Sequence, residues 1–118
     1  AMVRHTETHR GLNYHFFTAF LIIIHILFII PKVTKEKETQ KILLKPLMFL
    51  AVLVSSQVFL GLASYIYKIV MAPAPMPRTA EVLFTTAHQS NGALILATTL
   101  ILTLVSFRFL EKIKKRGA

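Results

Sequence analysis

A polar run led by a histidine interrupts the last long apolar segment of the chain. Ala87-His88-Gln89-Ser90-Asn91-Gly92-Ala93 combines an imidazole with three other polar side chains and small residues. Polar and ionisable groups inside a membrane span are costly, so they usually face a bundle interior or a bound group. Because histidine is a common axial ligand of haem iron, the run leads to the hypothesis that His88 binds haem in a small helical bundle.

A low-spin haem in such a bundle needs a second histidine at the depth of His88. His88 precedes Arg108, at the basic inner end of its span, by 20 residues. His9 and His15 precede Lys32, at the inner end of the first span, by 23 and 17 residues. Each is therefore about one helical turn from the level of His88, and depth alone leaves both open as the second ligand.

The other two histidines are weaker candidates. His25 lies only seven residues before Lys32, too deep in its span to pair with His88. We interpret it as a packing histidine bonded to a backbone or hydroxyl group, with a second haem or a quinone as the alternative partner. His5 is interpreted as a solvated loop residue. His15 is either a packing residue or a ligand.

Length and composition place these residues in a membrane. The chain has 118 residues, 54% of them hydrophobic, and no cysteine. Three apolar runs, Leu12–Ile30, Leu43–Met71 and Val82–Leu110, approach or exceed the roughly 20 residues that cross a bilayer. We therefore predict an all-α integral membrane bundle of three transmembrane helices. The lack of cysteine excludes Cys-ligated zinc or iron–sulfur sites and covalently attached haem.

The net charge of +9 is concentrated at the span ends. Ten of the fourteen basic residues are predicted on one face: Lys32, Lys35, Lys37, Lys41, Lys45, Arg108, Lys112, Lys114, Lys115 and Arg116. The positive-inside rule makes this face cytoplasmic, with the N-terminus outside. The expected partners are anionic membrane lipids and not nucleic acid. We expect a bacterial or archaeal plasma membrane.

Prolines and caps set the predicted element boundaries. Pro31 is expected to end the first helix, and Pro46 to lie in the first turn of the second. Thr79 is a candidate N-cap of the third helix, with Glu81 in its first turn. The predicted elements are helix one over about 8–30, a cytoplasmic linker (which can be partly helical) over 31–45, helix two over about 46–71, an outer Pro-rich loop over 72–79, and helix three over about 80–113.

A polar line runs along the second helix. Gln57, Gly61, Ser64 and Lys68 step by four, three and four residues, so they share one helical face. A glycine there lets another helix or a flat ligand approach closely. The line is interpreted either as a helix–helix contact or as one wall of a cofactor pocket, with Lys68 near the acidic groups of the cofactor.

Three of these features together resemble the haem A synthase family. His9-Arg10 enters one span, Gln57-Val58-Phe59-Leu60-Gly61 lies in the next, and His88 opens the last. The chain is similar to the last three helices of one four-helix half of that enzyme, better to the C-terminal, haem b-binding half. The resemblance implies that His9 and His88 are the axial pair of a haem b, with His15 as the alternate to His9. Thr6 stands where the catalytic half of the family has a glutamate.

The remaining roles are hypotheses. Thr6, Gln89 or Asn91 can orient the ligating imidazoles through hydrogen bonds. Outer-side cations can pair with haem propionates; these are Arg10, Lys68 and Arg78. With Gln57 and Gly61 as pocket residues, the expected site is cofactor-binding, and catalytic residues are unknown.

We expect a haem b-binding membrane subunit that serves electron transfer or complex assembly. Because three helices barely enclose a haem, we expect a homo-oligomer or a place in a larger respiratory or photosynthetic complex. Whether the chain is an enzyme stays open, since a truncated or split haem A synthase, oxidising the methyl group of haem O, is an alternative. A membrane anchor of the succinate dehydrogenase type is a further alternative. It is weakened because helix two, which carries a haem ligand in such anchors, has no histidine here. A structural subunit without cofactor is the last alternative.

Overall fold

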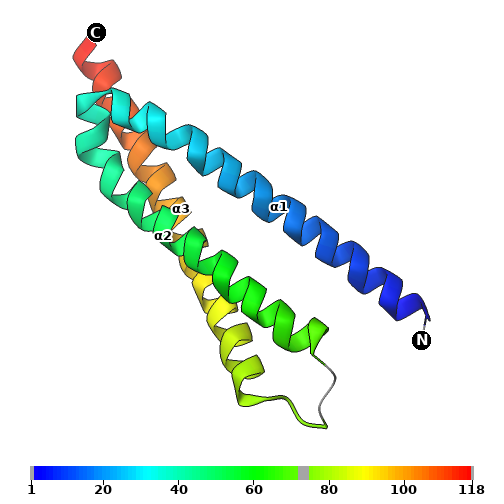
Figure 1. Ribbon diagram of the computed structural model, residues 1–118. Coiled ribbons are helices and arrows are strands. Elements are labelled where there is room, and N and C mark those ends of the chain that lie inside the picture. The colour runs from blue at the N-terminus through cyan, green and yellow to red at the C-terminus, as the bar shows by residue number, and fades with distance from the viewer. Residues whose placement is uncertain (1, 72–74, 118) are drawn as a thin grey trace. The chain divides into compact units, whose positions relative to one another are not determined.

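The computed structural model describes the backbone of residues 2–71 and 75–117, and the side chains of residues 10–71 and 75–116 (Figure 1). Within these ranges it contains the long helices α1 (Met2–Lys35), α2 (Lys37–Tyr65) and α3 (Thr79–Gly117). A short π-helical segment, η1 (Ile66–Val70), continues α2. The described residues include no strand. The prediction of an all-α fold is confirmed.

Three helical segments of the described chain are long and apolar enough to cross a membrane: Arg10–Lys35, Lys37–Val70 and Thr79–Arg116. Large apolar side chains are widely exposed on them, with Phe59 at 74% and Leu96 at 72%. A water-soluble chain rarely leaves so much apolar surface uncovered. Length, composition and exposed surface are those of a membrane protein with three candidate transmembrane helices.

The chain divides into two units, Ala1–Gln40 and Lys41–Ala118, and each is described by itself. In the first unit, the predicted end of helix one at Pro31 is wrong, because α1 continues through Pro31 to Lys35. Proline removes one backbone donor but leaves its carbonyl available, and the Thr34 hydroxyl donates to that carbonyl at 3.1 Å. The helix-forming lysines that follow favour continuation.

The predicted linker over 31–45 is likewise replaced by helix, interrupted only at Glu36. The Gln40 amide donates to the Glu36 carbonyl at 2.8 Å, which is the first backbone bond of α2. The Thr39 hydroxyl donates to the Glu36 carboxylate at 3.0 Å. Glu36 thus begins α2 by both its backbone and its side chain, and Pro46 lies inside α2 instead of in its first turn.

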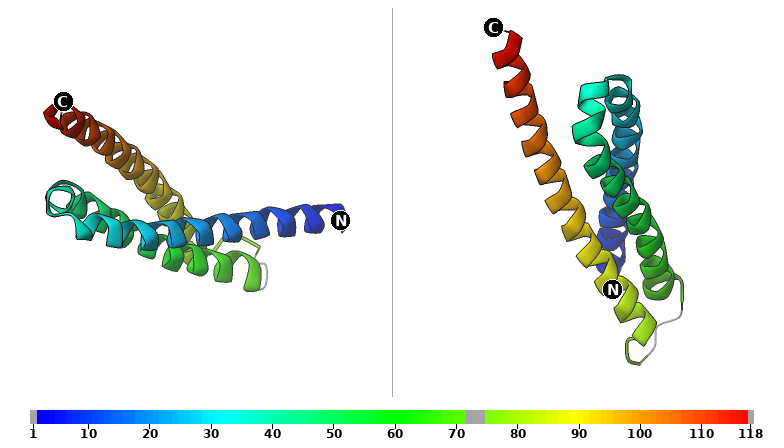
Figure 2. Two further views of the ribbon diagram at one scale, coloured as in Figure 1. Left: turned by 90° about the horizontal axis from the view of Figure 1, so that it is seen from above. Right: turned by 90° about the vertical axis from the view of Figure 1, so that its left-hand side faces the viewer.

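In the second unit, α2 and α3 form an antiparallel pair. The start of α3 lies beside the end of α2, and the two helices diverge toward the C-terminus of α3 (Figures 1 and 2). The Val82 amide donates to the Arg78 carbonyl at 3.1 Å, so the backbone cap is Arg78, one residue before the predicted Thr79. Glu81 lies in the first turn of α3, as predicted. Residues 72–74 of the expected loop lie outside the described residues.

Candidate functional site

Two glycines bring α2 and α3 close together within the second unit. A Cβ atom on Gly61 would lie 2.9 Å from Cε1 and 3.3 Å from Nδ1 of His88. A Cβ atom on Gly92 would lie 3.2 Å from Nε2 of Gln57. Each helix therefore offers a glycine on which a polar side chain of the other helix rests, which is how small residues serve packing in membranes.

Hydrogen bonds join the same residues across the two helices. Asn91 Nδ2 donates to the Leu53 carbonyl and to Gln57 Oε1, both at 2.8 Å. Gln57 Nε2 lies 3.5 Å from His88 Nε2, at the outer limit of hydrogen bonding. Gln57, His88 and Asn91, with Gly61 and Gly92, are called the polar cluster below. Asn91 is 9% exposed, and Gln57 and His88 are half-buried.

The surroundings of the cluster are largely apolar. Tyr67 and Phe84 stack one to two turns away, with ring centroids 5.6 Å apart and an interplanar angle of 17°. The Thr85 hydroxyl, one turn before His88, is buried and has no hydrogen-bond partner among the described residues. In such an environment hydrogen bonds are electrostatically stronger than in water, so the bonds of Asn91 hold the cluster in one arrangement.

The structure brings together four of the residues selected from the sequence, namely Gln57, Gly61, His88 and Asn91. Two other candidates lie beyond the cluster toward the connection between α2 and α3. Lys68 is exposed on η1, and Arg78 is half-buried just before α3. The expected pairing of Lys68 and Arg78 with haem propionates therefore stays a prediction, and it concerns the η1 end of the second unit and not the polar cluster.

The candidates on α1 belong to the first unit. Arg10 and His15 are exposed there, as is His25. The side chain of His9 lies outside the described residues, as do those of His5 and Thr6. The pairing of His88 with His9, or with His15, stays a prediction.

Some polar residues named from the sequence do not join the cluster. The Ser64 hydroxyl donates to the Leu60 carbonyl of its own helix at 2.8 Å. Gln89 is exposed, so Asn91 is the cluster member among the suggested orienting residues. Sequence reasoning missed the contact of Gly92 with Gln57 and the role of the Leu53 carbonyl. Gly92 could have been found from its four-residue spacing from His88, which places both on one face.

The polar cluster contains one side chain of a type that can ligate haem iron, the imidazole of His88. Among the described residues no group of three or more His, Cys, Asp or Glu side chains could hold a metal ion. Haem iron needs only axial ligands from the protein, and His88 supplies an imidazole that Gly61 and Gln57 hold in place.

The substitution Gly61→Ala tests the fit between Gly61 and His88. Its methyl group would overlap His88 Cε1, so we expect the imidazole to rotate away from α2. Because the atom in the way is at the tip of a side chain, we expect the overlap to cost about 1 kcal/mol, which the gain of about 1 kcal/mol in helix propensity largely offsets. The displaced ring should show as a changed NMR signal of His88.

Gly11→Ala is the matched control, since a Cβ atom at Gly11 would meet nothing within 4 Å. The same chemical change should there leave the His88 signal in place and gain about 1 kcal/mol from helix propensity. An unshifted His88 signal in Gly61→Ala would contradict the described contact.

Comparisons with models of known protein families, with curated proteins and with solved structures find no match to this chain. The resemblance to haem A synthases stays a prediction from the motifs around His9, Gln57 and His88.

Proposed function

We propose that the chain is a haem b-binding membrane subunit in which His88 is one axial ligand of the iron. His9 is the other, with His15 as the alternative. The observation that supports this proposal is the placement of an imidazole at the α2–α3 contact, on Gly61 and beside the amide of Gln57. An ionisable side chain at such a place in a membrane span is by default a functional candidate.

Each residue has a distinct part in this proposal. His88 binds the iron through a ring nitrogen, and Gln57 and Gly61 fix the position of the ring. Lys68 and Arg78, at the end of the second unit, pair with the propionates, as does Arg10. When bound, the haem supplies one-electron transfer, and the protein sets its ligands and surroundings.

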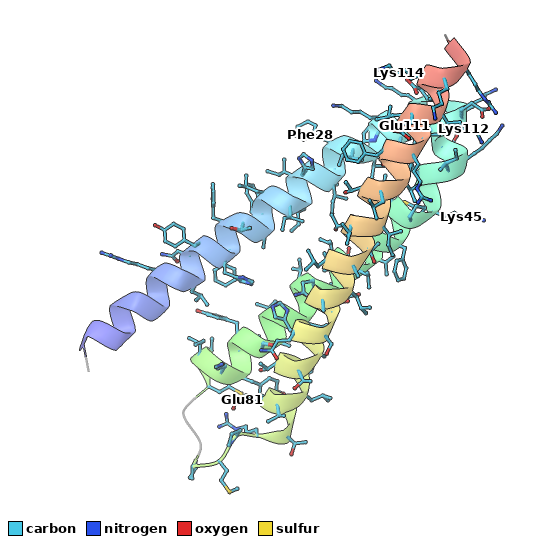
Figure 3. All side chains as sticks on the ribbon, turned by 180° about the vertical axis from the view of Figure 1, so that it is seen from behind. Phe28, Lys45, Glu81, Glu111, Lys112 and Lys114 are labelled. Atoms are coloured by element: carbon cyan, nitrogen blue, oxygen red, sulfur yellow. The ribbon has the colours of Figure 1, made fainter. Side chains whose placement is uncertain are left out.

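The proposed orientation rests on the charges of the second unit. Lys45 of α2 lies at the same end of this unit as Lys112 and Lys114, whereas Glu81 lies at the opposite end (Figure 3). By the positive-inside rule the lysine end is cytoplasmic and meets anionic lipids. The N-terminus is then outside, in a bacterial or archaeal plasma membrane. A homo-oligomer or a larger respiratory or photosynthetic complex completes the haem enclosure.

A second candidate function is a structural subunit without cofactor. The observation that favours it is the bonding of Asn91, whose amide nitrogen donates to the Leu53 carbonyl and to Gln57 Oε1 and so joins α3 directly to α2. In this case His88 is a packing residue seated on Gly61.

The test is a reduced-minus-oxidised absorption spectrum of the purified full chain, with pyridine haemochrome extraction to identify the haem. We expect sharp low-spin bands and haem b alone. Two haems per functional unit, or any haem A, would instead support a truncated or split haem A synthase. A chain that takes up no haem during expression or reconstitution would be the structural subunit.

A further inference from the structure

The hydrogen bonds of the polar cluster have only one possible direction, and the Leu53 carbonyl sets it. A backbone carbonyl accepts and cannot donate. The Asn91 atom 2.8 Å from it must therefore be the amide nitrogen. That nitrogen carries a second hydrogen, which points to Gln57 at 2.8 Å. The Gln57 atom that accepts it must be the amide oxygen, since two N–H groups would repel each other.

The orientation of the Gln57 amide in turn decides which ring nitrogen of His88 carries the proton. With its oxygen held by Asn91, Gln57 turns its amide nitrogen toward His88 Nε2, at 3.5 Å. An amide nitrogen only donates, so a neutral His88 must present a lone pair at Nε2 and carry its proton at Nδ1. The opposite tautomer would set two N–H groups face to face at 3.5 Å, whereas the proposed tautomer places the proton on the buried Nδ1 atom.

We propose that the Leu53 carbonyl, Asn91 and Gln57 act together to fix His88 as the Nδ1–H tautomer. Gln57 and Asn91 are then positioning residues, because they act on the proton and lone pair of His88. Gly92 makes this possible, since a Cβ atom there would lie 3.2 Å from Gln57 Nε2. The amide of Gln57 thus occupies space that another residue at position 92 would restrict.

The fixed tautomer matters because a metal binds the ring nitrogen that lacks a proton. The cluster leaves Nε2 as that nitrogen. The assignment of haem iron as the ligand rests on the proposed function. The position of the proton does not, since it follows from the hydrogen bonds that join the Leu53 carbonyl, Asn91, Gln57 and His88.

The experiment is NMR of the haem-free full chain, labelled with ¹⁵N-histidine and held in lipid nanodiscs. The long-range ¹⁵N–¹H couplings of an imidazole distinguish its two tautomers, and His88→Gln identifies the signal by its loss. We expect the proton of the neutral His88 ring at Nδ1. A proton at Nε2, or an equal mixture of tautomers, would overturn the inference.

Gln57→Glu tests the cause of the tautomer. The carboxylate still accepts from Asn91 but offers His88 an acceptor in place of a donor, so we expect a proton to appear at Nε2. Gln89→Glu is the matched control, because Gln89 is exposed next to His88 and should leave the proton at Nδ1. An Nδ1–H tautomer that persists in folded Gln57→Glu would also overturn the inference.

Failure of this inference and failure of the proposed function give different results. A chain that shows the Nδ1–H tautomer but never takes up haem would leave the inference intact and refute the haem proposal. A chain that binds haem b but shows the Nε2–H tautomer in the absence of haem would refute the inference and leave the haem proposal intact. If Gln57→Glu does not fold, the measurement on the unsubstituted chain still decides the inference.

Discussion

Replacing His88 with glycine is expected to lower the haem b content of the purified chain by roughly tenfold or more. Mutation of an outer partner of a metal ligand already costs about 10–100-fold in metal affinity, and His88 is proposed to bind the iron itself. The haem that remains should lose its sharp low-spin bands, because one axial position is then empty. Pyridine haemochrome extraction and a reduced-minus-oxidised spectrum measure both effects.

His25→Gly is the control for this substitution. It introduces the same glycine into a membrane-spanning helix at an exposed position, at a cost of about 0.3–0.5 kcal/mol in helix propensity. We expect full haem content and an unchanged spectrum. Haem loss in His9→Gly but not in His15→Gly would identify His9 as the second ligand, and the reverse would identify His15. Equal haem retention in His88→Gly and His25→Gly would refute the ligand assignment.

Replacing Asn91 with alanine is expected to lower the free energy of unfolding by about 1–2 kcal/mol. The change removes two donated bonds of 2.8 Å and leaves the Gln57 oxygen without its donor. Hydrogen bonds between membrane helices contribute about 0.6 kcal/mol on average and up to about 1.7, whereas an unsatisfied buried polar group costs about 1–3 kcal/mol. Reversible denaturant unfolding in detergent micelles gives the free-energy difference.

Ser90→Ala provides the comparison for Asn91→Ala. Ser90 precedes Asn91 in α3 and is exposed, so its loss should change the free energy of unfolding by less than about 0.5 kcal/mol. If both alanine variants were equally stable, the Asn91 bonds would contribute nothing to the α2–α3 contact. The inferred direction of the hydrogen bonds would then lack its starting point, which is the bond from Asn91 to the Leu53 carbonyl.

The sequence was sufficient to predict the class of fold, because long apolar runs permit few structures in a bilayer other than helices. It was less informative about helix ends. Pro31 predicts an end by its missing donor, yet α1 continues to Lys35. The lysines and glutamates between Pro31 and Pro46 form helix well, and only the backbone around Glu36 shows where one helix stops and the next begins.

The candidate site was partly predictable for a related reason. Helical spacing within one span selected Gln57 and Gly61, and a polar run selected His88. No spacing within a helix tells which residue of the next helix lies opposite. The pairing of Gly61 with His88, and of Gly92 with Gln57, depends on how α2 and α3 are aligned. The role of the Leu53 carbonyl is invisible in the sequence, because every residue has one.

The most direct measurement of the central claim is an imidazole titration of haem-reconstituted His88→Gly protein. The glycine leaves the space of the lost ring open beside Gly61, so free imidazole can occupy the vacant axial position. If His88 is the ligand, the variant should lack the low-spin spectrum at first and regain it as imidazole is added. A low-spin bis-histidine spectrum in the variant before any imidazole is added would show that the iron is held by other residues, and would contradict the account.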